Sequence, residues 1–116
     1  MIVTVKITKD ENMLSYIKMI RSYNKKLSIG EIKRQIENND TVIEFDTSGY
    51  DFNDEFTKGL TEDDYNFDFY KFLEEIQDKG AKLIIFLDNK KADMQSLYHR
   101  LVFEKEIRHE IEMYPD

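Results

Sequence analysis

The chain has 116 residues, of which 41% are hydrophobic and 13% aromatic, and it carries a formal net charge of −7. This length suits a single domain, residues 1–116, whose apolar content is sufficient for a core without disulfides or a structural metal. The lack of cysteine excludes a disulfide framework, a thiolate nucleophile and a Cys-ligated zinc site, and the negative charge argues against direct binding of nucleic acid.

The first residues predict a β-strand. Val3, Val5 and Ile7 alternate with polar residues, which is the pattern of a half-buried strand. The segment lacks the basic start of a signal peptide, and no apolar run in the chain approaches the ~18 residues of a membrane helix. We therefore expect a cytoplasmic protein without a membrane partner.

Two helices and a short strand are predicted to follow. Thr8–Glu11 and Ser28–Glu31 have the spacing of capping boxes, which mark helix starts. The apolar residues that recur at helical spacing after these starts are Met13, Ile17 and Ile20 in the first helix and Ile29, Ile32 and Ile36 in the second. Asn38–Asp40 is predicted to end the second helix, and residues 41–46 are predicted to form a strand.

The acidic segment, residues 44–68, contains most of the charge imbalance. It carries nine acidic residues and only Lys58 as a cation, for a net charge of −8, whereas residues 1–43 carry +3 and residues 69–116 carry −2. Five aromatic residues in or beside its irregular part, residues 47–65, argue against plain disorder. Acidic side chains raise the rate of encounter with a basic protein, and aromatic side chains supply buried anchors at an interface.

This composition predicts a partner-binding surface. Its candidate residues are Glu44, Asp46, Tyr50, Asp51, Phe52, Asp54, Glu55, Phe56, Glu62, Asp63, Asp64 and Tyr65. The alternative interpretation is a solvated loop whose aromatic side chains cover the core.

The remainder of the chain predicts a third helix, a buried strand and an extension. Residues 66–79 show helical periodicity, and Gly80 stands where a left-handed residue ends a helix. Residues 81–87 are almost continuously apolar, which predicts a central strand covered on both faces. For the extension we favour a short helix over about 91–99 and then a long amphipathic strand over 101–113, with one bent helix as the alternative.

Three segments resemble the C-terminal domain of the bacterial ribosomal stalk protein. Ile17–Arg21 is similar to its I-K-x-V-R stretch, Leu27–Glu37 to its L-G-L-K-E-A-K-x-L-V-E stretch, and Ile76–Leu83 to its L-E-x-x-G-A-x-V ending. The resemblance implies an α+β fold with a β-α-α-β-(acidic loop)-α-β core over residues 1–87 and an extension over residues 88–116.

The same resemblance implies one possible function. The helix pair of that family recruits translation factors, and Lys18, Arg21 and Lys33 match positions on its surface. The sequence departs from the family pattern at Ser28 and Gly30, and none of the 116 residues is expected to match the dimerisation domain or hinge of the family. The chain also resembles barstar, a small acidic ribonuclease inhibitor, but only in the order of its elements and in its charge.

The sequence also contains residues that suggest catalytic or metal-binding alternatives. Asp46 and Asp88 each follow a predicted strand and could hold Mg²⁺ with Lys90 near a phosphate, as in a metal-dependent nuclease. The carboxylates of a calcium loop would be Asp64, Asp68 and Glu75, but the segment is predicted to be helical. His99 and His109 have no neighbouring ligand or triad pattern.

The sequence therefore favours a non-catalytic cytoplasmic binding domain, a monomer or weak dimer that needs no cofactor or metal. Its expected partner is a basic protein, and a cognate toxin such as a nuclease fits best because the site that binds its phosphate substrate must be basic. The alternatives are a regulatory module of the translation machinery and the nuclease-like enzyme.

Overall fold

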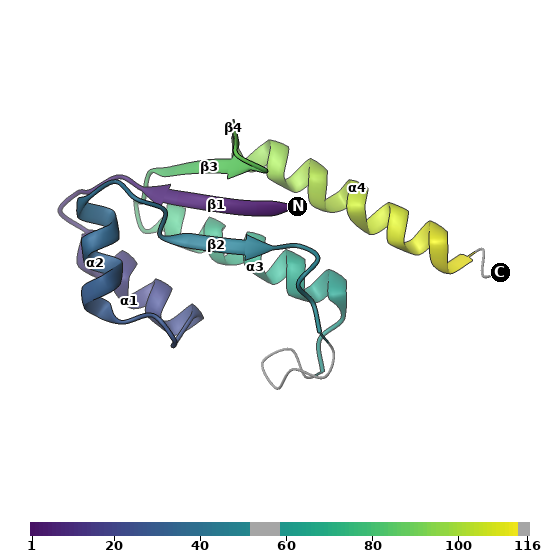
Figure 1. Ribbon diagram of the computed structural model, residues 1–116, viewed down its shortest axis with the longest axis horizontal. Helices are drawn as coiled ribbons and strands as arrows, with labels where there is room; N and C mark the ends of the chain where they lie inside the picture. The colour runs from purple at the N-terminus through teal and green to yellow at the C-terminus, as the bar shows by residue number, and fades with distance from the viewer. Residues whose placement is uncertain (52–58, 114–116) are drawn as a thin grey trace.

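The computed structural model describes residues 1–51 and 59–113, the side chains of residues 112 and 113 excepted. The elements, in chain order, are β1 (Ile2–Ile7), α1 (Met13–Tyr23), α2 (Ile29–Glu37), β2 (Ile43–Asp46), α3 (Glu62–Asp78), β3 (Leu83–Leu87), β4 (Lys90–Ala92) and α4 (Met94–Met113) (Figure 1). The α+β class is confirmed, and the order from β1 to β3 is β-α-α-β-α-β.

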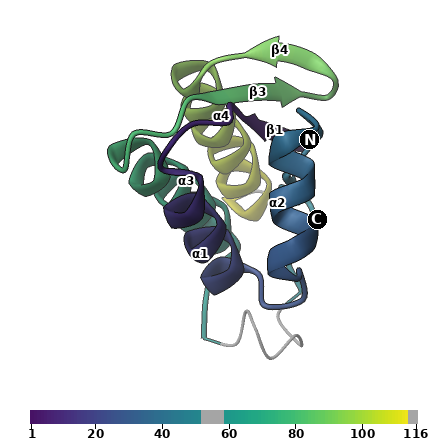
Figure 2. The ribbon, with the colours of Figure 1, turned by 90° about the vertical axis from the view of Figure 1, so that its left-hand side faces the viewer.

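The strands form one antiparallel sheet in the order β2-β1-β3-β4. Val3 lies opposite Phe45 on one side and Leu87 on the other, and all three side chains are buried. Because successive side chains of a strand point to opposite faces, this register gives the sheet one core face. Figure 2 shows α1, α3 and α4 on one side of β3 and β4.

The prediction that the third strand is covered on both faces is wrong. Ile84 and Phe86 point away from the core and are only partly buried. The ammonium group of Lys6 lies 5.7 Å from the centre of the Phe86 ring and shields part of it. The apolar run of residues 81–87 therefore belongs to a strand with one core face and one half-open face.

The predicted start of the first helix is also wrong. Thr8 does not cap it, because its N–H extends the sheet by donating to the carbonyl of Lys82 at 3.0 Å. The chain then turns at Asp10, whose carboxylate accepts the N–H of Asn12 at 2.7 Å and the hydroxyl of Tyr16 at 2.9 Å. Tyr16 is fully buried, and this burial together with the bond to Asp10 raises the pKa of its hydroxyl.

The second helix begins as predicted. The Ser28 side chain accepts the N–H of Glu31 at 3.1 Å, which satisfies one of the free donors of the first turn. Ile32 and Ile36 are buried in the core, whereas Ile29 is 50% exposed and does not join it.

The third helix is longer than predicted at its start. It begins at Glu62 rather than Asn66, after Thr61, whose hydroxyl accepts the N–H of Asp64 while the Asp64 carboxylate accepts the N–H of Thr61. This capping box turns the last part of the acidic segment into the first turn of α3. The predicted end is confirmed: Gly80 has φ of 103°, a conformation that glycine adopts without strain.

The predicted strand over residues 101–113 is wrong, and the alternative of a single helix holds. Asp88 and Asn89, with φ of 49° and 68°, form the two-residue turn of a hairpin that places β4 beside β3, and α4 follows. Leu97 and Leu101 are buried in the same core cluster as the strands, so residues of the extension complete the core of residues 1–87. None of the helices in the described part of the chain has both the length and the apolar character to cross a membrane.

Candidate protein-binding groove

The structure separates the described residues of the predicted surface. Glu44 and Asp46 alternate with buried residues on β2 and are exposed on the half-open face of the sheet. Glu62, Asp63 and Asp64 lie at the start of α3. Phe52, Asp54, Glu55 and Phe56 lie outside the described residues, so their arrangement stays a prediction.

Tyr50 and Tyr65 pack against each other at the edge of the core. Their rings lie 5.9 Å apart, and Tyr65 lies 4.9 Å from Phe45 of β2. The hydroxyl of Tyr50 donates to the carbonyl of Leu60, so this hydrogen bond links described residues on either side of residues 52–58. Asp51, next in the chain, is exposed.

The carboxylates at the start of α3 are bound to groups of the same chain. Asp63 forms an ion pair with Arg108 of α4, and its other oxygen lies 2.7 Å from Nε2 of His109. Glu62 lies 3.7 Å from Arg108, and Asp64 caps its own helix. Burial alone would raise the pKa of Asp63, but the hydrogen bonds from Arg108 and His109 outweigh it and hold the pKa below its usual range.

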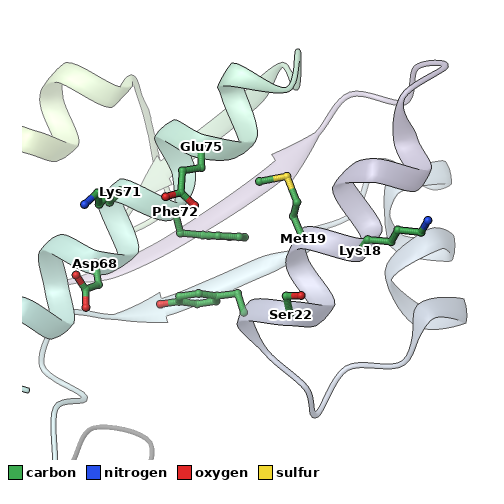
Figure 3. Close-up of a pocket in the computed structure, with 8 residues that line it drawn as sticks. Lys18, Met19, Ser22, Asp68, Lys71, Phe72 and Glu75 are labelled. Carbon is green, nitrogen blue, oxygen red and sulfur yellow. The ribbon is translucent and has the colours of Figure 1, made fainter. Parts of the chain in front are cut away.

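A groove runs between α1 and α3, and Tyr23 lies at its centre. We call it the Tyr23 groove; in Figure 3 the side chains of Lys18, Met19 and Ser22 come from α1, and those of Asp68, Lys71, Phe72 and Glu75 come from α3. The Tyr23 ring stacks on Phe72, with centroids 4.4 Å apart and planes 14° apart. Tyr23 is nevertheless 43% exposed, so one face of this aromatic pair is open to a partner.

The groove continues past Tyr23 to β2. Its second part shares Ser22, Tyr23 and Asp68 with the first, and is also lined by Asn24, Lys25, Lys26, Glu44, Phe45, Leu60 and Tyr65. The two parts have volumes of about 520 and 500 Å³. Each volume is enough for several side chains of a partner.

Charges are distributed unevenly across the groove. Lys18, Lys25 and Lys26 belong to α1 or the residues after it, and Glu44, Asp68 and Glu75 belong to β2 and α3. Lys71 is the exception on α3. The four lysines outnumber the three carboxylates over the whole groove, and the negative excess is confined to the wall formed by β2 and α3. The floor of the groove is aromatic, and burial raises the pKa of the Tyr23 hydroxyl.

Both carboxylates of the predicted magnesium pair accept hydrogen bonds from backbone N–H groups. The carboxylate of Asp88 accepts the N–H of Ile2 at 2.9 Å, and that of Asp46 accepts the N–H of Ser48 at 2.8 Å. Lys90 pairs with Leu87 in the β3–β4 hairpin. In the described ranges, no group of three or more His, Cys, Asp or Glu residues is placed to hold a metal ion.

The calcium-loop alternative conflicts with the backbone. Asp64, Asp68 and Glu75 all lie on α3, so their segment cannot wrap around an ion as a calcium loop does. Asn66, which would be a further ligand, is buried and donates its amide to the carbonyl of Thr47 at 3.2 Å.

Sequence reasoning missed the aromatic floor of the groove. Tyr23 and Phe72 stand at ordinary helical spacing in α1 and α3, and nothing in such spacing distinguishes a covered side chain from one at an open groove. The acidic content of residues 44–68 did include Glu44 and Asp68, which line the groove. Both residues line one groove only because the folded chain brings α3 and β2 to the same part of the molecule.

Comparison of the chain with protein-family models, with curated proteins and with solved structures gives no significant match. The resemblances to the ribosomal stalk domain and to barstar therefore rest on the residues and features quoted above. Of the matching surface residues, Lys18 lines the Tyr23 groove, whereas Lys33 of α2 lies 3.9 Å from Glu37 in a helical ion pair.

Proposed function

We propose that the chain is a non-catalytic binding domain whose Tyr23 groove receives a segment of a basic protein. The observation that carries this proposal is the partly exposed Tyr23 ring, stacked on the buried Phe72, in a groove that Glu44 and Asp68 help to line. Exposed aromatic rings supply most of the binding energy at many interfaces. Neighbouring carboxylates add selectivity for cations and accelerate encounter.

The partner class follows from charge. A net charge of −7 repels nucleic acid and attracts basic proteins over distances of about 10 Å at ordinary ionic strength. Nucleases are basic where they hold phosphate, so an acidic domain that covers such a site blocks it without chemistry of its own. In this proposal the chain is an inhibitor or immunity protein that neutralises a nuclease toxin in the cytoplasm.

The test is capture of the partner followed by inhibition. The intact chain, immobilised, is used to retain proteins from an extract of the cells that produce it, and the retained protein is identified and purified. We expect a basic protein whose nuclease activity falls to background at a one-to-one ratio with the chain. Tyr23→Ala, and separately the pair Glu44→Lys and Asp68→Lys, should each weaken binding by about 100-fold.

Matched controls are present in the chain. Tyr98 is 44% exposed, almost the same as Tyr23, but lies on α4 outside the groove, so Tyr98→Ala should leave the affinity unchanged. Glu74 and Asp78 are exposed carboxylates of α3 outside the groove, and their reversal to lysine changes the net charge by the same amount as the test pair. If the groove variants bind as the controls do, or if the retained partner is a ribosomal particle, the proposal is wrong.

A further inference from the structure

The distal half of α4 leaves large apolar side chains in solvent. Phe103, Ile107 and Ile111 are 58%, 40% and 68% exposed, and their spacing of four residues places them along one side of the helix. We call them the α4 stripe. Single exposed apolar residues are ordinary, but three in a row on one helix mark an interaction surface.

The shape of the molecule explains why the core does not cover the stripe. Leu97 and Leu101 anchor the first half of α4, and the second half extends past the ends of the strands (Figure 1). The molecule measures 53 × 30 × 22 Å, with a radius of gyration of 15.2 Å. A compact domain of this length would have a radius of about 13 Å, so the extended helix adds length without adding core.

The basic side chains of this half of α4 contact α3. Arg108 pairs with Asp63 and Glu62, His109 contacts Asp63, and the Lys105 ammonium lies 5.7 Å from the centre of the Phe67 ring. These three side chains therefore contact α3 and not the stripe.

The carboxylates of the same half border the stripe. Glu106 and Glu110 follow Phe103 and Ile107 by three residues, and both are exposed. Neither forms an ion pair with any residue of the described ranges. Glu104, three residues before Ile107, accepts the Thr47 hydroxyl at 3.4 Å and keeps part of its surface exposed.

The carboxylates beside the α4 stripe argue against a second copy of the chain as the partner that covers it. In a two-fold antiparallel pairing, a flank of one helix meets the same flank of the other. Glu106 and Glu110 would then face Glu106 and Glu110 of the other copy, and like charges across an interface disfavour that pairing. The complementary occupant has an apolar face with cations along its edges.

We propose that the α4 stripe docks an amphipathic helix of another protein, whose apolar face is bordered by lysines or arginines. This site lies on a different element from the Tyr23 groove and is independent of the function proposed above. Helix-in-groove and helix-on-helix recognition use apolar anchors at this spacing, and the flanking charges select the partner and its direction.

The experiment uses the intact chain and two synthetic peptides. Both are amphipathic helices of about 18 residues with the same leucine face; one has lysines along its borders and the other has glutamates. Fluorescence anisotropy should show the lysine peptide binding at least about tenfold more tightly than the glutamate peptide. The double variant Phe103→Ser with Ile111→Ser should bind the lysine peptide at least about tenfold more weakly. The double variant Glu106→Lys with Glu110→Lys should reverse the preference between the two peptides.

The control is Leu14→Ser on α1. Leu14 is 59% exposed, like Phe103, but lies outside the stripe, so this change should leave peptide binding intact. Equal binding of the lysine peptide by the wild type and by the stripe variant would overturn the proposal. So would a dimer in sedimentation equilibrium, or binding to neutral phosphatidylcholine vesicles, that the stripe variant abolishes.

Discussion

The carboxylates of the acidic segment fall into two groups with different physical roles. At the start of α3, Asp63 is paired with Arg108 and His109, and Asp64 completes a capping box with Thr61. Glu44 and Asp68 line the Tyr23 groove instead, where they form no ion pair with any described residue and where the Tyr23 ring is 43% exposed.

The difference teaches that an excess of negative charge in a sequence is not a measure of the charge offered to a partner. Carboxylates that neutralise the chain's own cations contribute to folding, and only the remainder can steer a basic protein. The following changes separate the two groups, beginning with the largest expected effect on stability.

Replacing Arg108 with Met should have the largest effect. The substitution leaves the carboxylate of Asp63, 23% exposed, without its strongest donor. Hydrogen bonds to charged groups contribute about 1.5–3 kcal/mol, and partial exposure to solvent reduces this value, so we expect the free energy of unfolding to fall by about 1–2 kcal/mol. Urea denaturation measures it. Arg100→Met, at an exposed cation of the same helix, should change it by less than about 0.5 kcal/mol.

Replacing Thr61 with Ala should have the next largest effect. The change removes the hydroxyl that accepts the N–H of Asp64, and loss of such a cap costs about 1 kcal/mol. Thr8→Ala is the control, because Thr8 has the predicted capping sequence but its side chain has no capping role in the structure. Equal loss of stability in both variants would contradict the observed start of α3.

Lowering the pH should remove the contribution of Asp63 to the free energy of unfolding. A carboxylate whose pKa is depressed in the folded state stabilises the protein above its unfolded pKa of about 3.9, and this stability is lost as the pH falls through the lower folded pKa. The difference in unfolding free energy between the wild type and Asp63→Asn should therefore be full at about pH 5 and decline below about pH 4. A difference that stayed constant down to pH 2 would show that the ion pairs do not support the fold.

Neutralising the groove should have the smallest effect on stability. Glu44→Gln with Asp68→Asn removes two exposed charges that have no ion-pair partner among the described residues, so the free energy of unfolding should change by less than about 0.5 kcal/mol. Thermal denaturation would show a shift of no more than a few degrees. A larger loss of unfolding free energy would show that these two carboxylates stabilise the fold.

Local chemistry predicted much of the fold. The alternation of Val3, Val5 and Ile7, the cap at Ser28 and the left-handed Gly80 each fix an element through interactions within a few residues. Thr61 with Asp64 carried an equally local signal, but the irregular sequence before it led to a later predicted start. These features can be predicted from the sequence because each of them satisfies backbone groups that are near neighbours in the chain.

The rest depends on contacts that are distant in sequence. The strand prediction for residues 101–113 assumed that Leu101, Phe103 and Ile107 share one buried face, whereas α4 buries Leu101 and leaves the other two exposed. Similarly, Asp63 and Arg108 are 45 residues apart, and no spacing rule pairs them. The Tyr23 groove exists because α1 and α3 pack side by side on the sheet.

The most direct test of the account measures stability and binding on the same variants. With the partner identified by capture, the account predicts that Glu44→Lys with Asp68→Lys raises the Kd by about 100-fold and leaves the midpoint of urea unfolding unchanged. It also predicts that Arg108→Met lowers that midpoint and leaves the Kd unchanged. If the groove reversals leave the Kd unchanged while Arg108→Met weakens binding, the carboxylates that meet the partner are not those of the Tyr23 groove.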